Sequence, residues 1–347
     1  MKVLAIGATG VIGRHVVSKL ADAGHEVAVL HRGHASLPAH PGITGIVGDR
    51  SAIRDFRGRF REWAPDVAID MILSSAAQAQ ATLEALHGIA RRMVAVSSAD
   101  VYRAMAVLHR LDSGALEPVP LTEGSTLRQQ SQTYSPEAPA AVRGIFPWMD
   151  TEYDKVQVER AIGADSGLPA TILRLPMVYG PGEPLHRLYP FVKRAQDRRP
   201  AVLEDRFAQW VPCRGYVENV AEAIAVAATS EHAAGRIYNV ADPEAFTEAE
   251  WTAKIVRVVV VPREKAPAHL VKPYRFEQHL FMESKRIREE LGYREPVPID
   301  EALRRTVAWE GANPPARIDP SQFDYAAEDA ALPLISSTSG MQPTTTG

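Results

Sequence analysis

The sequence has almost no cysteine and no long hydrophobic run. Its 347 residues include a single cysteine, Cys213, so the chain cannot form an internal disulfide, and a core of this size needs none. No apolar stretch approaches the roughly 18 residues that a membrane helix requires, and the first residues lack a signal-peptide layout. These absences predict a cytoplasmic protein with no membrane partner.

Charge of one sign and metal-binding patterns are also lacking. The 39 Lys and Arg residues against 42 Asp and Glu residues give a net charge of −3, so no overall basic field would attract nucleic acid. The histidines are scattered, and neither a Cys/His pattern nor an HExxH helix is present, so no metal site is predicted. Hydrophobic residues make up 46% of the chain, which indicates a folded protein rather than a disordered one.

Short apolar runs alternate with longer amphipathic ones. The pattern predicts strands over residues 3–6, 26–30, 43–47, 67–72, 93–97, 170–175 and 236–240. It predicts helices over residues 11–23, 77–91, 151–164 and 218–229. Alternation of this kind predicts βαβ units, and hence an α/β fold with a doubly wound parallel sheet.

A glycine-rich turn joins the first predicted strand to the first predicted helix. It reads Gly7-Ala8-Thr9-Gly10-Val11-Ile12-Gly13. Glycines let backbone N–H groups approach a pyrophosphate closely, and the N-terminus of the helix favours the anion. The position of the turn therefore predicts dinucleotide binding, the alternative being an ordinary structural turn.

Further motifs make the chain resemble the extended (atypical) short-chain dehydrogenases/reductases, of the NAD(P)-dependent epimerase/dehydratase family. Besides the glycine turn, they are Gly48-Asp49-Arg50, Val96–Tyr102 (VSSADVY), Leu173–Gly182 (LRLPMVYGPG), Arg214–Ala221 (RGYVENVA), Tyr238-Asn239-Val240, and Ser284-Lys285-Arg286 before Glu289–Tyr293 (EELGY). The resemblance covers nearly all of residues 1–315. It implies a Rossmann-type sheet with a smaller C-terminal substrate-binding domain.

The composition and the strand–helix pattern also predict an organisation of the chain. Residues 103–150, which contain several prolines, are predicted to form a long insertion above the strand ends, where substrate loops lie. The expected units are a dinucleotide-binding domain at 1–176, to which 211–242 return, a substrate-binding domain at 177–210 and 243–315, and a tail at 316–347 that is disordered from about residue 332.

The activity implied by the resemblance is that of an NAD(P)-dependent oxidoreductase or epimerase/dehydratase. The substrate would carry a hydroxyl or carbonyl carbon, in a sugar-nucleotide-like molecule or a secondary metabolite. Two alternatives stay open: a cofactor-binding protein without redox turnover, such as a dinucleotide sensor, and an isomerase or lyase that uses the cofactor without redox turnover. The expected partner is a small-molecule substrate, and a homodimer is the candidate assembly.

The residues after the second strand bear on the choice of cofactor. Members that use NAD place an acidic residue there, whereas this chain has His31-Arg32-Gly33. A guanidinium suits a 2′-phosphate, so NADP is favoured over NAD, unless Arg32 only stacks on adenine or faces solvent. Asp49 matches the adenine-contacting aspartate of the family, or is a simple turn residue. The predicted cofactor-binding residues are Gly7, Thr9, Gly10, Val11, Ile12, Gly13, His31, Arg32, Asp49, Arg50, Lys155, Pro176 and Val178.

The family's catalytic residues are a Ser or Thr, a Tyr and a Lys. Ser98 stands four residues before Tyr102, in the family's hydroxyl position, or else caps the strand end. The family spaces its Tyr and Lys four residues apart, but here Tyr153 and Lys155 are two apart, and the lysine register puts Thr151 in the tyrosine position. Two residues rotate by about 200° on a helix. Tyr153 can thus serve as acid/base only from before the helix or from a distorted first turn, and otherwise is a packed or surface aromatic.

Asp100 is a second acid/base candidate. It lies two residues after Ser98, where dehydratases of the family carry an acidic base, and the alternative is a turn or cap residue. Asp70 replaces a residue that is usually His in the family, and its one expected role is a contact under the nicotinamide. The predicted catalytic residues are Ser98, Asp100, Tyr153 and Lys155. The predicted substrate-binding residues are Ser98, Tyr179, Arg187 and Arg214.

Overall fold

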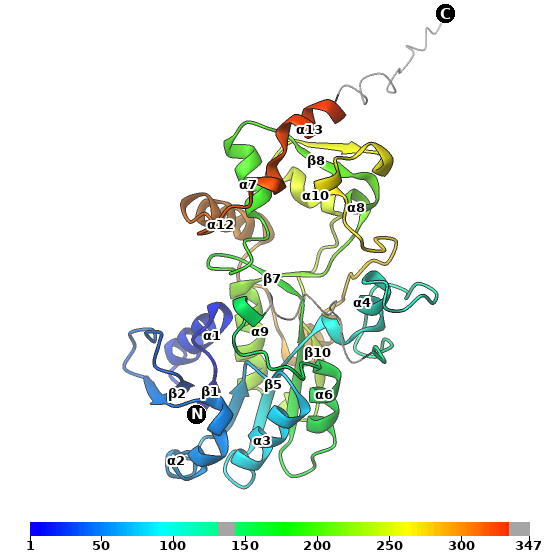
Figure 1. Cartoon of the computed structure of the whole chain (residues 1–347). Helices are drawn as coiled ribbons and strands as arrows, with labels where there is room; N and C mark the ends of the chain where they lie inside the picture. Colours follow the sequence, from blue (N-terminus) through cyan, green and yellow to red (C-terminus); the bar gives the residue numbers. More distant parts are fainter. Residues whose placement is uncertain (131–142, 333–347) are drawn as a thin grey trace, which may run out of the picture.

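A parallel sheet forms the centre of the computed structural model, which describes residues 1–130 and 143–332. Its seven strands run in the order β10-β6-β5-β4-β1-β2-β3 (Figure 1). They are β1 (Lys2–Ile6), β2 (Glu26–His31), β3 (Ile43–Val47), β4 (Val67–Asp70), β5 (Arg92–Ser98), β6 (Ala170–Leu175) and β10 (Ile237–Asn239). Every pairing is parallel, so the predicted doubly wound α/β fold is confirmed.

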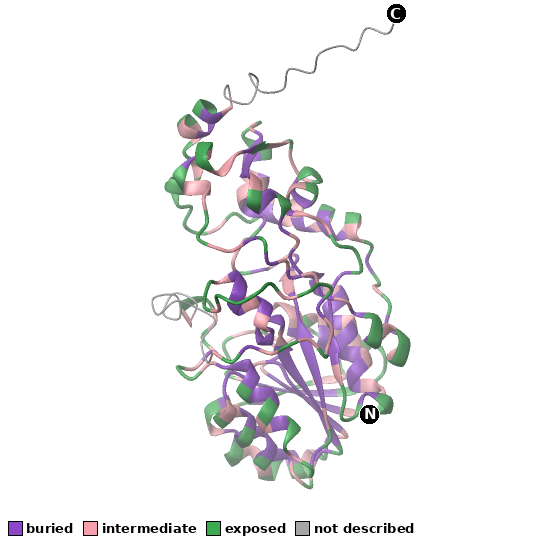
Figure 2. Cartoon of the chain, turned by 90° about the vertical axis from the view of Figure 1, so that its right-hand side faces the viewer, coloured by how far each residue is buried: buried purple, intermediate pink, exposed green. Residues whose placement is uncertain are grey.

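Helices cover both faces of this sheet. One face packs against α1 (Val11–Asp22), α9 (Val217–Thr229) and α11 (Lys285–Leu291). The other face packs against α2 (Arg57–Trp63), α3 (Ala76–Leu86) and α6 (Lys155–Gly163). The strands are therefore buried on both sides, as Figure 2 shows, which explains their nearly continuous apolar sequences.

The predicted start of one helix is wrong. The range 151–164 was expected to be helical throughout, but α6 begins at Lys155. The Asp154 side chain accepts a hydrogen bond from the backbone N–H of Val156 at 3.0 Å, which caps the helix and ends the preceding loop. Tyr153 consequently precedes the helix.

Most elements that do not belong to the sheet gather at the end of the molecule opposite α2 and α3, while β7 (Met177–Tyr179) lies near the middle (Figure 1). The strand pairs are β7 (Met177–Tyr179) with β9 (Arg214–Tyr216), and β8 (Ala201–Glu204) with β11 (Val258–Val261). The helices of this group are α7 (Tyr189–Gln196), α8 (Asp205–Gln209), α10 (Glu248–Ala253), α12 (Ile299–Ala312) and α13 (Tyr325–Ala331). A buried ion pair of 2.5 Å between Arg194 and Glu328 joins α13 to α7, so the described part of the predicted tail, 316–332, is folded. Residues 333–347, expected to be disordered, lie outside the described residues.

The insertion predicted at 103–150 is described except for residues 131–142. It begins with α4 (Arg103–Leu108). It ends at Asp150, whose carboxylate accepts hydrogen bonds from the hydroxyls of Ser74 (3.2 Å) and Ser75 (2.6 Å). These bonds fix residues 145–150 at the edge of the sheet where β4 ends.

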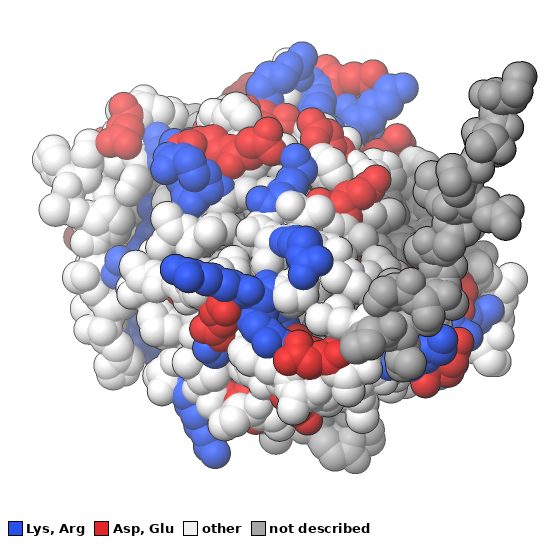
Figure 3. Space-filling model, turned by 90° about the horizontal axis from the view of Figure 1, so that it is seen from above, with Lys and Arg blue, Asp and Glu red and all other residues white. Residues whose placement is uncertain are grey.

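The surface seen from above carries both signs of charge. Lys and Arg side chains lie among Asp and Glu side chains over this face (Figure 3).

Within residues 1–130 and 143–332, no helix is long and apolar enough to cross a membrane. The same residues contain no group of three or more His, Cys, Asp or Glu side chains placed to hold a metal ion.

Candidate active site

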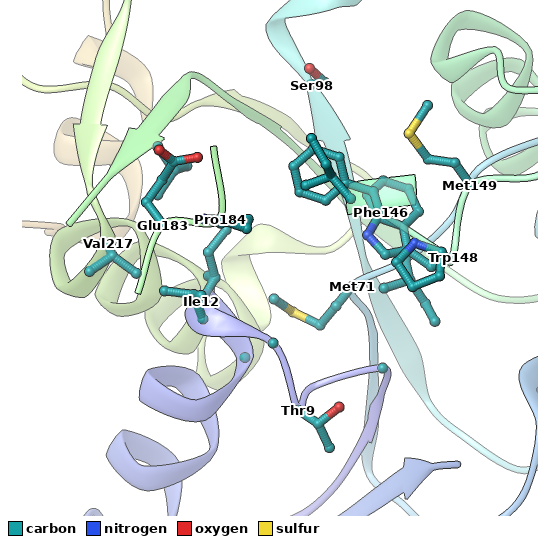
Figure 4. A pocket seen from close by; sticks show the side chains of 18 of the residues that line it. Thr9, Ile12, Met71, Ser98, Phe146, Trp148, Met149, Glu183, Pro184 and Val217 are labelled. Carbon is teal, nitrogen blue, oxygen red and sulfur yellow. The ribbon is translucent and has the colours of Figure 1, made fainter. Parts of the chain in front are cut away.

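A cavity of about 800 Å³ lies at the carboxyl ends of the central strands. The glycine turn after β1, the ends of β2 and β5, strand β7 and residues 145–150 form its walls. Figure 4 shows Ser98 and Thr9 at opposite sides of the view, with Met71, Phe146 and Trp148 between them. Open parallel sheets bind their ligands at this edge, where the strand order reverses.

The glycines of the turn have different roles: two are required by the fold, and one leaves space for a ligand. Gly7 adopts a φ of +73°, which favours glycine, and a Cβ on Gly13 would lie 2.4 Å from the backbone of Ala8. A Cβ on Gly10 would meet nothing within 4 Å and would instead project into open space beside the cavity. Gly7 and Gly13 are thus needed by the fold, whereas Gly10 keeps a space free.

The N-terminus of α1 fits the pyrophosphate of a dinucleotide. Gly10 is its N-cap, no side chain caps it, and its first turn holds no acidic residue. Thr9, Val11 and Ile12 line the cavity beside it. Uncapped N–H groups at the start of a long helix attract an anion.

Arg32 is exposed at the end of β2 and lines the cavity together with His31 and Asp49. Asp49 accepts hydrogen bonds from the backbone N–H and the hydroxyl of Ser51 at 2.8 and 2.7 Å. These bonds, and then the nearby Arg32 guanidinium, lower the pKa of Asp49. Asp49 is thus a turn residue that also faces the cavity, so both interpretations of it are compatible with the structure.

Arg50 turns toward the interior of the protein. Its Nη2 donates to Asp70 Oδ2 at 2.6 Å and to the Thr82 hydroxyl at 3.1 Å, and all three side chains are buried. Although Arg50 touches the cavity, Asp70 does not line it. Asp70, the carboxylate in the family's histidine position, therefore pairs with Arg50 and does not line the cavity.

Ser98 and Asp100 lie where β5 ends, and both line the cavity. Ser98 Oγ accepts a hydrogen bond from the backbone N–H of Asp100 at 3.2 Å, so it caps the strand end while it faces the cavity. Asp100 is buried, and burial raises the pKa of its carboxyl group. Arg128, Tyr153 and Lys155 partly oppose that increase.

Tyr153 reaches Asp100 from the loop before α6. Its hydroxyl donates to Asp100 Oδ2 at 2.6 Å. Because Tyr153 precedes the helix, the rotation of about 200° between residues two apart on a helix does not apply to Tyr153 and Lys155. Tyr153 is not among the residues that line the cavity, and Thr151, in the family's tyrosine position, is exposed.

Lys155 is buried behind the cavity wall. Its Nζ donates to the carbonyl oxygens of Leu73 at 2.5 Å and Val96 at 3.0 Å, and it lies 5.4 Å from the centre of the Trp148 ring. Burial lowers the pKa of Lys155 to about 8, against the opposing effect of Asp100. The structure thus places Lys155 close to the candidate acid without exposing it to the cavity.

Sequence reasoning missed Arg128, which holds this arrangement together. Its buried guanidinium donates to the Asp100 carbonyl oxygen at 2.8 Å and to Asp154 Oδ1 at 3.0 Å. It therefore connects the end of β5 to the cap of α6. No periodic pattern surrounds Arg128, so nothing in its neighbourhood predicts this role.

Sequence reasoning also missed the cavity residues Phe146, Trp148 and Met149. They belong to residues 145–150, a region for which only the general location above the strand ends was expected. Pro176, Val178, Tyr179 and Arg187, predicted from the family motifs, do line the cavity. Arg214 does not, and it pairs with Glu248 at 2.6 Å.

Comparisons with known proteins agree with this geometry. A family model described as NAD(P)H-binding matches residues 7–197, more than half of the chain. The 2′-dehydrokanamycin reductase of Streptomyces kanamyceticus is 29% identical over 218 residues, which cover 60% of this chain and 53% of that protein. A 3-beta-hydroxysteroid dehydrogenase of Mycolicibacterium neoaurum is 44% identical over 48 residues, which cover 14% of this chain and 13% of that protein. The chain spans about half the length of the curated relatives it matches first.

Solved structures share the fold over most of their length. The epimerase Mth375 of Methanothermobacter thermautotrophicus superposes with a TM-score of 0.66 at 19% identity, covering 90% of this chain and 92% of the other. The dTDP-glucose 4,6-dehydratase of Bacillus anthracis, in complex with NAD, gives 0.65 at 16% identity, covering 90% and 97%. The expected resemblance to epimerases and dehydratases is thereby confirmed for the fold.

Proposed function

Because the chain belongs to the NAD(P)H-binding family, we propose that it is an NADP-dependent oxidoreductase acting on a hydroxyl or carbonyl carbon of a small molecule. One observation carries the proposal. A single cavity joins the uncapped start of α1 to Ser98 and Asp100, so a bound dinucleotide and a proton donor would share it. The reductase among the curated relatives supports the direction of carbonyl reduction.

The cofactor would be held by residues of the first three strands and their turns. The N–H groups after Gly10 would bind the pyrophosphate, and Arg32 would bind a 2′-phosphate. When bound, NADPH supplies the hydride that the carbonyl carbon accepts.

The protein itself would supply the proton. In carbonyl reduction the carbon gains a hydride and the oxygen gains a proton, so the site needs an acid beside that oxygen. The Ser98 hydroxyl would orient the oxygen, and the Asp100–Tyr153 pair would deliver the proton. A carboxyl group whose pKa is raised by burial retains its proton to higher pH, as a general acid must.

Mixing the purified protein with NADPH and a panel of ketones and keto sugars tests the proposal. Loss of the cofactor's absorbance that depends on both the protein and the carbonyl compound is the expected result. Tight binding of NADPH with no turnover of any compound would contradict the oxidoreductase assignment.

We also expect Arg32→Ala to discriminate between the two cofactors. Loss of charge-assisted hydrogen bonds worth about 1.5–3 kcal/mol should weaken NADPH binding about ten- to a hundredfold and leave NADH binding nearly unchanged. Calorimetric titration of both cofactors measures this. Arg91→Ala is the matched control, because Arg91 is also exposed and pairs with Glu231 away from the cavity. Equal losses for NADPH and NADH would rule out the phosphate contact.

A second candidate function is a dinucleotide-binding protein without redox turnover. The burial of Lys155 behind Trp148 favours it, because the family's lysine normally reaches the cofactor ribose. Measuring cofactor affinity in Lys155→Met separates the candidates. Weaker binding would mean that the lysine reaches the cofactor, as the enzyme requires, and unchanged binding would favour the sensor.

The assignment of cofactor binding and substrate binding to separate parts of the chain stays part of the proposal. Residues 1–176 and 211–242 would hold the cofactor, and 177–210 with 243–315 would form the substrate side. The described cavity is compatible with this division, because β7 and Arg187 line the same cavity as the glycine turn.

A further inference from the structure

Many of the side chains that line the cavity are apolar, and we call six of them the apolar end. Its side chains are those of Met105, Phe146, Trp148, Met177, Cys213 and Leu280. They come from α4, from residues 145–150, from β7 and from two later loops, so separate parts of the chain converge to form one apolar surface. Thioether and aromatic side chains adapt to apolar ligands of irregular shape.

The six side chains of the apolar end carry no charge, and the Arg187 and Glu183 side chains that also line the cavity are paired with each other. Arg187 Nη1 donates to Glu183 Oε1 at 2.7 Å. The Glu183 carboxylate also accepts from the backbone N–H groups of Leu185 (2.9 Å) and Arg187 (3.0 Å). A ligand could recruit either charge only by leaving its buried or half-buried partner unpaired, which is costly.

Arg214, predicted to bind substrate, is not available either. It forms the 2.6 Å ion pair with Glu248, and its guanidinium lies 4.6 Å from the centre of the Trp251 ring, away from the cavity. A diphosphate is recognised by several charge-assisted hydrogen bonds from unpaired cations or N–H groups. Among the described residues, the apolar end provides no unpaired cation for that purpose.

The carboxylates are engaged in the same way. Asp150 accepts from Ser74 and Ser75, and Asp100 accepts from Tyr153. Among the buried carboxylate oxygens of the described lining residues, only Asp100 Oδ1 has no hydrogen-bond partner, so a polycationic amino sugar would find a single such acceptor for its several ammonium groups.

We propose that this site takes an uncharged, predominantly apolar cyclic ketone or secondary alcohol, and neither a nucleoside diphosphate sugar nor an amino sugar. The proposal rests on the proposed function for the position of the reacting carbon beside Ser98. The apolar end would contribute binding through burial of the carbon skeleton, and the Asp100–Tyr153 pair would be the polar contact that fixes the hydroxyl or carbonyl oxygen.

Calorimetric titration of the NADP-loaded protein tests the substrate class without requiring turnover. Probes are cyclohexanol, decahydro-2-naphthol, UDP-glucose and kanamycin. Affinity should increase from cyclohexanol to decahydro-2-naphthol, approaching about fourfold for each added methylene group that is buried. UDP-glucose and kanamycin should bind more weakly than decahydro-2-naphthol.

Met177→Gln tests whether the apolar end is the surface that binds. The change nearly conserves volume but places an amide among apolar groups, so decahydro-2-naphthol should bind about tenfold more weakly. NADP affinity should not change. Val260→Gln, on an exposed position of β11, is the matched control and should leave both affinities at wild-type values.

The outcomes separate this inference from the proposed function. Preferential binding or turnover of UDP-glucose or kanamycin overturns the apolar substrate class and leaves the oxidoreductase proposal intact. Binding of decahydro-2-naphthol that Met177→Gln weakens, with no hydride transfer to NADP, supports the substrate class and counts against the oxidoreductase. Equal affinity in wild type and Met177→Gln overturns the assignment of the apolar end.

Discussion

Gly10→Val should abolish dinucleotide binding in a protein that still folds. The Cβ of residue 10 meets no atom within 4 Å, so the valine can be accommodated when no ligand is bound. With a ligand present, its methyl groups would occupy the space where the pyrophosphate approaches the start of α1. We expect roughly a hundredfold or greater loss of NADPH affinity by calorimetry, with a wild-type circular dichroism spectrum.

Gly13→Val provides the matched control, because it makes the same chemical change one helical turn away. There the Cβ would lie 2.4 Å from the backbone of Ala8, so the turn and helix must move apart. Overpacking of this kind costs about 1–3 kcal/mol, and urea unfolding should show the loss. Wild-type NADPH affinity in folded Gly10→Val protein would mean that the glycine turn is not the cofactor site.

The central sheet was predictable because its signals are local. Strands β3 and β6 match the predicted ranges to the residue, since their apolar runs are bounded by turn residues. The sequence also contains a signal for the start of α6, which the predicted range 151–164 does not take into account. Asp154 followed three residues later by Gln157 is the pattern of a helix N-terminus, and it marks Lys155 as the first helical residue.

The candidate site was only partly predictable, because its remaining contacts join distant segments. Arg128 connects the end of β5 to the cap of α6, and Trp148 covers Lys155, but neither follows a periodic pattern. Arg50 matched a family motif, yet its guanidinium pairs with Asp70, twenty residues away in the sequence. Single-residue motifs located the edge of the sheet correctly and could not determine which way a long side chain turns.

The identity of the proton donor is the remaining question about the chemistry. Asp100 lines the cavity, whereas Tyr153 contacts Asp100 from outside the cavity lining. We therefore expect Asp100→Asn to reduce kcat/KM for carbonyl reduction by roughly 10²–10⁴, the usual effect of removing a positioned acid. Affinity for NADPH should stay near the wild-type value.

Tyr153→Phe should have a smaller effect and a different pH profile. It removes one hydrogen bond to the carboxylate, worth about 1.5–3 kcal/mol at most when the acceptor is charged. That bond favours the ionised form and lowers the pKa of Asp100, so its loss should raise this pKa further. Because reduction requires protonated Asp100, wild-type kcat/KM falls as pH rises through the pKa of Asp100. In Tyr153→Phe that fall should move to higher pH, and in Asp100→Asn it should disappear.

The opposite result would place the acid on the tyrosine. If Tyr153→Phe lost 10²–10⁴ in rate while Asp100→Asn kept most of its activity, the phenol would donate the proton directly and Asp100 would only orient it. Such a result would require Tyr153 to turn from Asp100 toward the substrate when the ligands bind. The pH profile distinguishes the two cases even if both variants lose activity. A carboxyl donor gives a limb that shifts in Tyr153→Phe and vanishes in Asp100→Asn, whereas a phenol donor gives the reverse.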